Sequence, residues 1–151
     1  MLKLSKKIDY GLILLSRMCA EPAPASAREM AGRYKLPQPM VANILKALAA
    51  NGVLASTRGV QGGYELARIP QEITLAQVVE ALEGPFNLVD CVAGGDSCKF
   101  TEVCPTHDPI QVVHEKFQKF MSRLTLAEIV GMPRQPLEIG TRSDENTNLY
   151  G

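Results

Sequence analysis

The feature that most constrains the fold is a pair of short predicted helices joined by a tight turn. The stretch SAREMAGRYKL begins with Ser26 and has Glu29 three residues later, a spacing typical of a capping box at a helix N-terminus. After the turn, the stretch QPMVANILKALAANG predicts a second helix, which has Pro39 in its first turn and ends in a left-handed cap at Asn51-Gly52. Two short helices joined in this way are typical of a helix-turn-helix.

The second helix is expected to have one buried face and one outward face. Its apolar residues at helical spacing are expected to be buried: Val41, Ile44, Leu45 and Leu48. The opposite face would present four side chains: Gln38, Met40, Asn43 and Lys46. Amide side chains can form two hydrogen bonds to adenine, and lysine can contact guanine or phosphate. The outward residues are therefore candidates for contacting DNA in the major groove.

A β-hairpin is expected directly after the second helix. Two β-prone pieces, residues 53–57 and 64–67, flank the sequence RGVQGG, in which three glycines in five residues favour a reversal of the chain. The adjacent glycine pair permits a bend that a Cβ atom would resist. A helix-turn-helix followed by such a hairpin predicts a winged helix. Arg58 and Gln61 are candidates for DNA contact, because an arginine at the hairpin tip could enter a neighbouring minor groove.

Four more helices are predicted by a capping residue followed by a periodic apolar pattern. They begin near Ser5, Thr74, Asp108 and Thr125. In the first of them, one face is expected to be buried, with Cys19 acting as a small apolar residue: Ile8, Leu12, Leu15 and Cys19.

The helix after Asp108, which has Pro109 in its first turn, is expected to form an interface. Its apolar residues recur at intervals close to an a/d seam: Ile110, Val113, Phe117, Phe120, Met121 and Leu124. A long helix with such a seam, placed after a complete small domain, predicts pairing between two copies of the chain. His114 lies inside this helix and is expected on its surface.

The pattern divides the chain into four parts, and the expected fold class is mainly α with one small β-hairpin. Residues 1–84 are expected to form the winged helix-turn-helix domain, and residues 85–107 a cysteine-rich loop. Residues 108–131 would supply the dimerisation helix and a short final helix. Residues 132–151 are polar and contain prolines, which predicts a mobile tail.

The net charge of zero hides an uneven distribution of charge along the chain. Residues 1–70 hold ten Lys or Arg against four Asp or Glu, a charge of +6, and the remaining residues carry −6. A basic half that contains the predicted winged helix suits a polyanion such as double-stranded DNA. Asp9 and Arg17 interrupt the N-terminal apolar stretch, so it predicts neither an export signal nor a membrane span, and a cytoplasmic protein is expected.

Three of the four cysteines lie in the stretch CVAGGDSCKFTEVCPTH. Cys91, Cys98 and Cys104 are separated by gaps of six and five residues, and His107 follows three positions after the last of them. In the cytoplasm, clustered thiols more often bind metals than form disulfides. Thiolates favour soft metals, so the stretch could hold an iron–sulfur cluster, hold zinc, or hold no metal. The wide gaps are unlike the paired ligands of a structural zinc site and favour the cluster.

The sequence contains no recognisable catalytic constellation. It has no paired nucleophile and base, no phosphate-binding loop and no dinucleotide fingerprint, and it has only two histidines. An enzyme is therefore not expected.

Four stretches occur in a specific order over about residues 1–130: LSKKIDYGLILL, LPQPMVANILKALAANGVL, RGVQGGYELAR and CVAGGDSCKFTEVCPTH. Together they resemble a family of bacterial winged-helix regulators that sense iron–sulfur clusters, of which IscR, NsrR and RirA are members. Within this family, the likeness is greatest to regulators of SUF-system iron–sulfur cluster assembly. The resemblance implies a homodimer with one cluster in each protomer, and two-fold symmetry predicts a pseudo-palindromic operator.

The resemblance also implies ligands for the cluster. By position, Cys91, Cys98 and Cys104 match the three thiolate ligands of the family. The fourth ligand stays open: His107 matches a histidine ligand of a 2Fe–2S cluster, and Asp9 matches an aspartate that the partner subunit contributes to a 4Fe–4S cluster.

The implied function is a repressor of iron–sulfur cluster assembly genes that is controlled by its own cluster. One alternative is a winged-helix regulator whose loop holds zinc or no metal and which responds to a metabolite or a protein. A second alternative, of another class, is an electron-transfer iron–sulfur protein.

Overall fold

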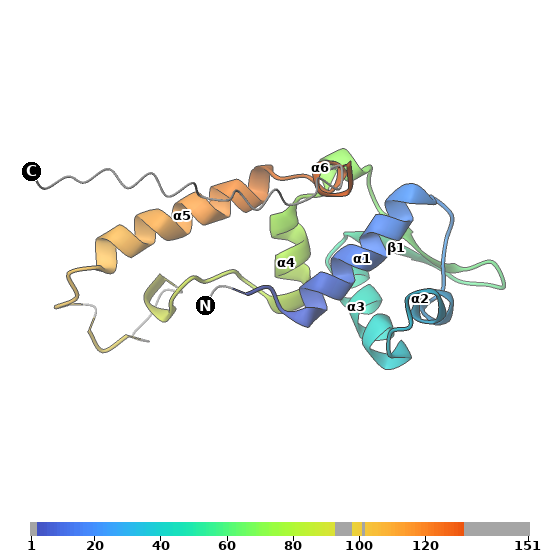
Figure 1. The fold of residues 1–151 in the computed structure, drawn as a ribbon, viewed down its shortest axis with the longest axis horizontal. Helices are drawn as coiled ribbons and strands as arrows, with labels where there is room; N and C mark the ends of the chain where they lie inside the picture. Colours follow the sequence, from blue (N-terminus) through green and yellow to red (C-terminus); the bar gives the residue numbers. More distant parts are fainter. Residues whose placement is uncertain (1–2, 93–97, 101, 132–151) are drawn as a thin grey trace, which may run out of the picture.

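The computed structural model of the protein describes residues 3–92, 98–100 and 102–131 (Figure 1). The expected tail, residues 132–151, lies outside the described residues. The elements follow one another in this order: α1 (Lys6–Ala20), α2 (Ala27–Tyr34), α3 (Gln38–Ala50), β1 (Leu54–Thr57), β2 (Gly63–Leu66), η1 (Pro70–Glu72), α4 (Leu75–Glu83), η2 (Asp90–Val92), α5 (His107–Arg123) and α6 (Leu126–Gly131). The described chain is mainly helical with one antiparallel hairpin, as expected, and it has the winged-helix arrangement.

The helices α1, α2 and α4 begin where capping residues predict them. Ser26 accepts a hydrogen bond from the Glu29 amide, and the Glu29 carboxylate accepts one from the Ser26 amide, at 3.2 and 2.7 Å. Thr74 and Gln77 form the same reciprocal capping box at the start of α4. These side chains satisfy backbone donors that have no partner within the helix, and they fix where α2 and α4 begin.

The start of α5 differs from the prediction by two residues. The N-cap is Thr106 rather than Asp108, because the Ile110 amide already donates to the Thr106 carbonyl oxygen at 3.0 Å. Asp108 therefore lies in the first turn, where the helix dipole favours an acid. Pro109 also lies in the first turn, where its missing N–H costs no intrahelical hydrogen bond.

The core is formed where the helices α1, α3 and α4 contact one another. The four apolar residues of α3 predicted to be buried are all at most 1 % exposed. On α1 the prediction was only partly right, because Leu14 and Met18 are buried, whereas Leu12 and Cys19 are half-buried. Since α1 contacts both α3 and α4, its buried face is broader than a single stripe.

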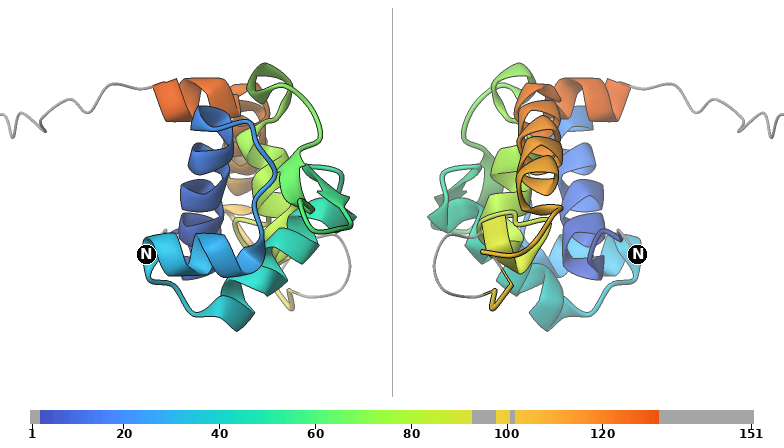
Figure 2. Two further views of the ribbon diagram at one scale, coloured as in Figure 1. Left: turned by 90° about the vertical axis from the view of Figure 1, so that its right-hand side faces the viewer. Right: turned by 90° about the vertical axis from the view of Figure 1, so that its left-hand side faces the viewer.

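The C-terminal end of α5 is fixed to the winged helix by backbone hydrogen bonds. The Leu75 amide donates to the Leu124 carbonyl oxygen at 2.9 Å, and the Leu126 amide donates to the Ile73 carbonyl oxygen at 2.7 Å. Leu126 is fully buried, and α6 lies across one end of α1 (Figure 2). The rest of α5 extends away from the winged helix (Figure 1).

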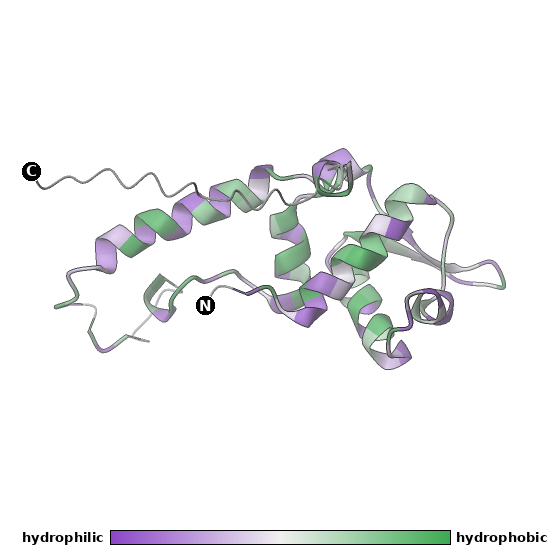
Figure 3. Cartoon of the chain, viewed as in Figure 1, coloured by the Kyte–Doolittle hydropathy of each residue, from purple (hydrophilic) through white to green (hydrophobic). Residues whose placement is uncertain are grey.

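The apolar residues of α5 fall on two faces rather than on one seam, and Figure 3 shows apolar and polar residues alternating along the helix. Met121 is buried towards α4. His114, expected on the surface, is instead only 7 % exposed, because Phe86 covers its ring. The outward face carries four exposed apolar residues: Val112, Val113, Phe117 and Phe120.

Candidate functional site

The outward face of α3 carries all four side chains expected there. Gln38, Met40, Asn43 and Lys46 are exposed, because the opposite side of the helix is packed into the core. Met40, Asn43 and Lys46 follow one another at intervals of three positions, so they form one continuous strip, and Gln38 lies in the first turn of the helix. Amide, thioether and ammonium groups on one strip can supply hydrogen-bond donors and acceptors, apolar contact and positive charge to a DNA groove.

The hairpin presents its tip to solvent beyond this helix. β1 pairs with β2 from Leu54↔Leu66 to Thr57↔Gly63, so the tip is formed by the residues between the strands. Arg58 and Gln61 are exposed there, as expected. Val60 was not singled out from the sequence, and it is 107 % exposed. The signal that could have revealed it is an apolar residue inside a glycine-rich turn.

Two arginines near the hairpin are engaged with an acid of the same chain. The carboxylate of Glu21 lies 2.6 Å from the guanidinium of Arg33 and 3.4 Å from that of Arg17. The hydrogen bond from Arg33 holds the pKa of Glu21 below its usual value. These contacts tie the end of α1 to α2, and they show that a count of positive charges in the sequence overstates the charge available to a polyanion.

The predicted metal ligands lie near the free end of α5. Cys91 is in η2, which contacts α5, and Cys104 lies three positions before the first residue of that helix. Cys91, Cys98 and Cys104 are all half-buried. His107 is the first residue of α5, and its ring nitrogens lie 3.0 Å from Asp108 Oδ1 and 3.3 Å from Gln111 Nε2.

The environment of Cys104 favours its thiolate. The Sγ atom lies 3.3 Å from the hydroxyl of Thr106, and hydrogen bonds from this side chain and from nearby amides lower the pKa of the thiol. Cys19 contrasts with it, because burial raises the pKa of the Cys19 thiol. A thiolate is the form that binds soft metals, so Cys104 has the chemistry of a ligand and Cys19 that of a core residue.

The candidate ligands suit a thiophilic metal or cluster in chemistry but are not gathered into a site. Within residues 3–92, 98–100 and 102–131, no three His, Cys, Asp or Glu side chains are placed to hold a metal ion. Asp9, the alternative fourth ligand, is exposed in the first turn of α1. Thiolates from one segment often come together only when the metal binds, because the metal supplies the free energy that orders them.

In the part of the chain that the structure describes, no helix is both long enough and apolar enough to span a membrane.

Comparison with known proteins identifies the family. Residues 4–132 match the Rrf2 family, described as iron-dependent transcriptional regulators. An HTH-type transcriptional regulator of Synechocystis sp. is 33% identical over 130 residues, covering 85% of this chain and 87% of that protein. The HTH-type transcriptional regulator IscR of Pectobacterium atrosepticum is 26% identical over 148 residues, covering 97% of this chain and 89% of the relative.

The fold also matches that of a solved member. CymR, the global cysteine regulator of B. subtilis, superposes with a TM-score of 0.67 at 24% identity, over 87% of this chain and 98% of that one. The resemblance to cluster-sensing regulators that the four sequence stretches carry is therefore confirmed at the level of the family. This chain belongs to the Rrf2 family of transcriptional regulators, which bind DNA.

Proposed function

We propose that this regulator represses genes for iron–sulfur cluster assembly, and that a cluster held by Cys91, Cys98 and Cys104 sets its affinity for the operator. The observation that carries the proposal is the position of the cysteines, between the winged helix and the free end of α5, with η2 against α5. Residues 1–84 would bind DNA, residues 85–107 would hold the cluster, and residues 108–131 would pair the subunits. The protein would act in the cytoplasm, where thiols stay reduced.

DNA binding is assigned to α3 and the hairpin tip. Asn43 and Gln38 offer amide groups that suit adenine, and Lys46 offers a cation for guanine or phosphate. Arg58 and Gln61 would contact the neighbouring minor groove. A two-fold dimer would place two such surfaces on a pseudo-palindromic operator, with half-sites about one helical turn or more apart.

Dimerisation is assigned to the outward face of α5. Phe120 and Val112 on this face are 59% and 51% exposed, which is unusual for large apolar residues on a helix that already packs on a core. The residues of α5 change in charge along its length, from Asp108 near its start to Lys119 and Arg123 near its end. Antiparallel pairing with a second copy would place acidic ends against basic ends and would cover the apolar face.

The cluster is assigned to three thiolates and one further ligand. Cys104 is suited to this role by its lowered pKa, and Cys91 and Cys98 would join it when iron binds. His107 is the candidate fourth ligand from the same chain, and Asp9 of the partner is the alternative. A bound cluster supplies chemistry that oxidants, nitric oxide or iron shortage can alter. Because a ligand shifts a conformational equilibrium only through different affinities for its two states, the cysteine segment must be arranged differently with and without the cluster.

The alternative function is a regulator that responds to a metabolite or a protein, with zinc or no metal in the loop. One observation favours it: CymR, a protein of the same fold, is named as a global cysteine regulator. Membership in a family of transcriptional regulators leaves the electron-transfer alternative without support.

Anaerobic purification tests the proposal. Iron and sulfide analysis, absorbance and a Mössbauer spectrum should show a 2Fe–2S or 4Fe–4S cluster, and zinc in its place would favour the alternative. Cys98→Ala should lose the cluster and change the affinity for the operator, whereas Cys19→Ser, at the thiol outside the segment, should do neither. A colourless, iron-free protein whose affinity for DNA is unchanged by Cys98→Ala would refute cluster control.

A further inference from the structure

His114 is a polar residue buried on the inner face of α5. Its imidazole is 7% exposed and stacks on the ring of Phe86, with 5.6 Å between ring centroids and 2° between ring planes. The amide of Leu88 donates a hydrogen bond to its Nδ1 atom at 3.4 Å. Since Nδ1 accepts, the imidazole carries its proton on Nε2 in this arrangement.

These two contacts join α5 to the segment that leads to the first cysteine. Phe86 follows the end of α4 at Gly84, and Leu88 lies just before η2, which contains Cys91. The partners of His114 are therefore 28 and 26 positions away in sequence but lie directly before the proposed cluster ligand. Because η2 also contacts α5, a change at His114 would weaken the attachment of this segment to α5 without altering any proposed ligand.

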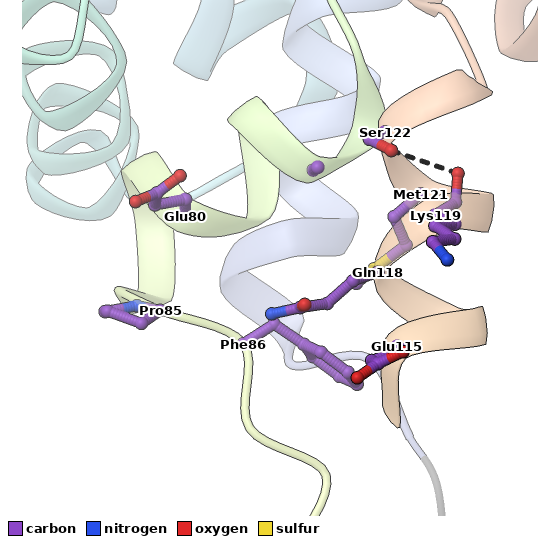
Figure 4. Close-up of a pocket in the computed structure, with 9 residues that line it drawn as sticks. Glu80, Pro85, Phe86, Glu115, Gln118, Lys119, Met121 and Ser122 are labelled. Atoms are coloured by element: carbon purple, nitrogen blue, oxygen red, sulfur yellow. Dashed lines mark hydrogen bonds between the residues drawn. The ribbon is translucent and has the colours of Figure 1, made fainter. Parts of the chain in front are cut away.

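The surroundings of Phe86 make the stack important for its position. Figure 4 shows Phe86 and Met121 at a groove of about 440 Å³ between α4 and α5. Phe86 also lines a second groove, of about 350 Å³, next to Ser5 and Ile8 of the N-terminal segment. Open space in two grooves beside the ring leaves room for it to move, and the flat face of His114 limits that movement.

We propose that His114 is a positioning residue that holds the Cys91-bearing segment against α5 and so favours retention of the cluster. A phenylalanine would supply the stack alone, whereas histidine also supplies an acceptor for the Leu88 amide. Two contacts of different kinds must then break before the segment separates from the helix. Only the role in cluster retention rests on the proposed function, because the contact between His114 and the segment is present in the protein without a cluster.

The first test uses cluster-free protein and amide hydrogen exchange followed by NMR. In His114→Phe, the Leu88 amide should exchange about threefold to tenfold faster, the change expected for the loss of one hydrogen bond. His114→Asn places an acceptor near the same position and should restore part of the protection. Val53→Ala is the control, because it removes methyl groups from the core of the winged helix, away from this contact. When urea is used to bring wild type and this variant to the same global stability, their exchange rates at Leu88 should be equal.

The second test measures the cluster itself. After anaerobic reconstitution, loss of iron to a chelator should be about threefold to tenfold faster in His114→Phe than in wild type, with His114→Asn between them. If the His114 variants fold poorly, Phe86→Leu replaces them in this test. It removes the stack and should also release iron faster than wild type. Val53→Ala should release iron at the wild-type rate.

The outcomes separate this inference from the proposed function. Unchanged exchange at Leu88 in His114→Phe overturns the inference, even if wild type holds a cluster. Faster exchange without faster iron release overturns the role in cluster retention. A wild-type protein that binds no iron while Leu88 responds as expected overturns cluster control and retention together, but supports His114 as the residue that fixes the segment.

Discussion

Ala25 and Tyr64 exchange two backbone hydrogen bonds, of 3.1 and 2.9 Å, and thereby fix the hairpin against the segment between α1 and α2. Gly63 lies at the same contact. A Cβ atom on Gly63 would be 2.6 Å from the carbonyl carbon of Ala25, closer than two such atoms approach in proteins. The direction of the proposed DNA-binding hairpin is therefore set by a close approach of two backbones.

Gly63→Ala should destabilise the protein by about 1–3 kcal/mol, because backbone on both sides of the contact must move. It should also weaken DNA binding by displacing the hairpin. Urea denaturation and operator titration measure the two effects. Gly32→Ala is the matched control, because a Cβ atom there meets nothing within 4 Å and alanine favours helix α2, so a gain of up to about 1 kcal/mol is expected. Equal effects of the two substitutions would contradict this explanation.

The sequence predicts the structural features that depend on residues close to one another in the chain. The capping box of Ser26 and Glu29 marks the start of α2 because both partners lie within three residues of each other. The glycine pair before Tyr64 predicts a bend. The sequence does not identify Ala25 as the bridge partner of Tyr64, because this bridge joins segments that are far apart in the chain.

The burial of His114 was missed for a related reason. The residue lies seven positions before Met121, so it shares the inner face of α5 with a buried methionine, and this spacing was the available signal. Histidine is intermediate between buried and exposed residue types, so the sequence does not place it unless its partner is known. Here the partner is Phe86, which the sequence placed in a loop. The cysteine spacing likewise predicts chemistry but not geometry, and the ligands remain candidates.

Substitutions on α3 should separate contacts to bases from contacts to phosphates. Asn43→Ala should cost about 1–3 kcal/mol on the preferred operator and relax the preference at one base pair, if its amide contacts a base edge. Lys46→Ala should weaken binding to all sequences and lower the slope of affinity against salt by about one, if its ammonium contacts phosphate. Titrations of both variants on matched operators at several salt concentrations check this. The assignment fails if both variants lose affinity equally on every sequence and at every salt concentration.

The ion pair of Glu21 should make stability depend on pH. Its pKa is lowered by the hydrogen bond and charge of Arg33, so the pair contributes stability above the ordinary pKa of a glutamate and loses it as pH falls through the lowered value. The difference in Tm between wild type and Glu21→Gln should therefore be present at neutral pH and vanish on acidification. It should be small and should shrink with added salt, because both side chains are exposed. A difference that persists in acid would contradict the ion pair as its cause.

Cys104 and Cys19 should differ in reactivity. In metal-free protein at neutral pH, iodoacetamide should modify Cys104 faster than Cys19, because hydrogen bonds from Thr106 lower the pKa of one thiol and burial raises that of the other. Thr106→Val should slow the reaction at Cys104 by removing the hydroxyl, and it should leave Cys19 unchanged. Mass spectrometry of the modified peptides over time gives both rates. A Cys104 rate that is the same with and without the hydroxyl would show that Thr106 does not activate the thiol.

Subunit pairing through the outward face of α5 should be sensitive to charge. Phe120 is 59% exposed in the single chain, and pairing would bury its ring against the second copy. Phe120→Asp should weaken the dimer by about 2 kcal/mol or more, roughly thirtyfold in Kd, because a carboxylate would have to be buried in an apolar interface. Sedimentation velocity over a range of concentrations measures the shift.

Val60→Asp is the control for this substitution. Val60 is more exposed than Phe120, at 107%, but it lies at the hairpin tip, remote from α5 in the fold (Figure 1). The same change from an apolar residue to an acid there should leave the dimer intact. It should weaken DNA binding, because a negative charge would face the phosphates. If Phe120→Asp leaves a dimer of wild-type affinity, or if Val60→Asp dissociates it, the subunits pair through another surface, and the outward face of α5 needs another partner.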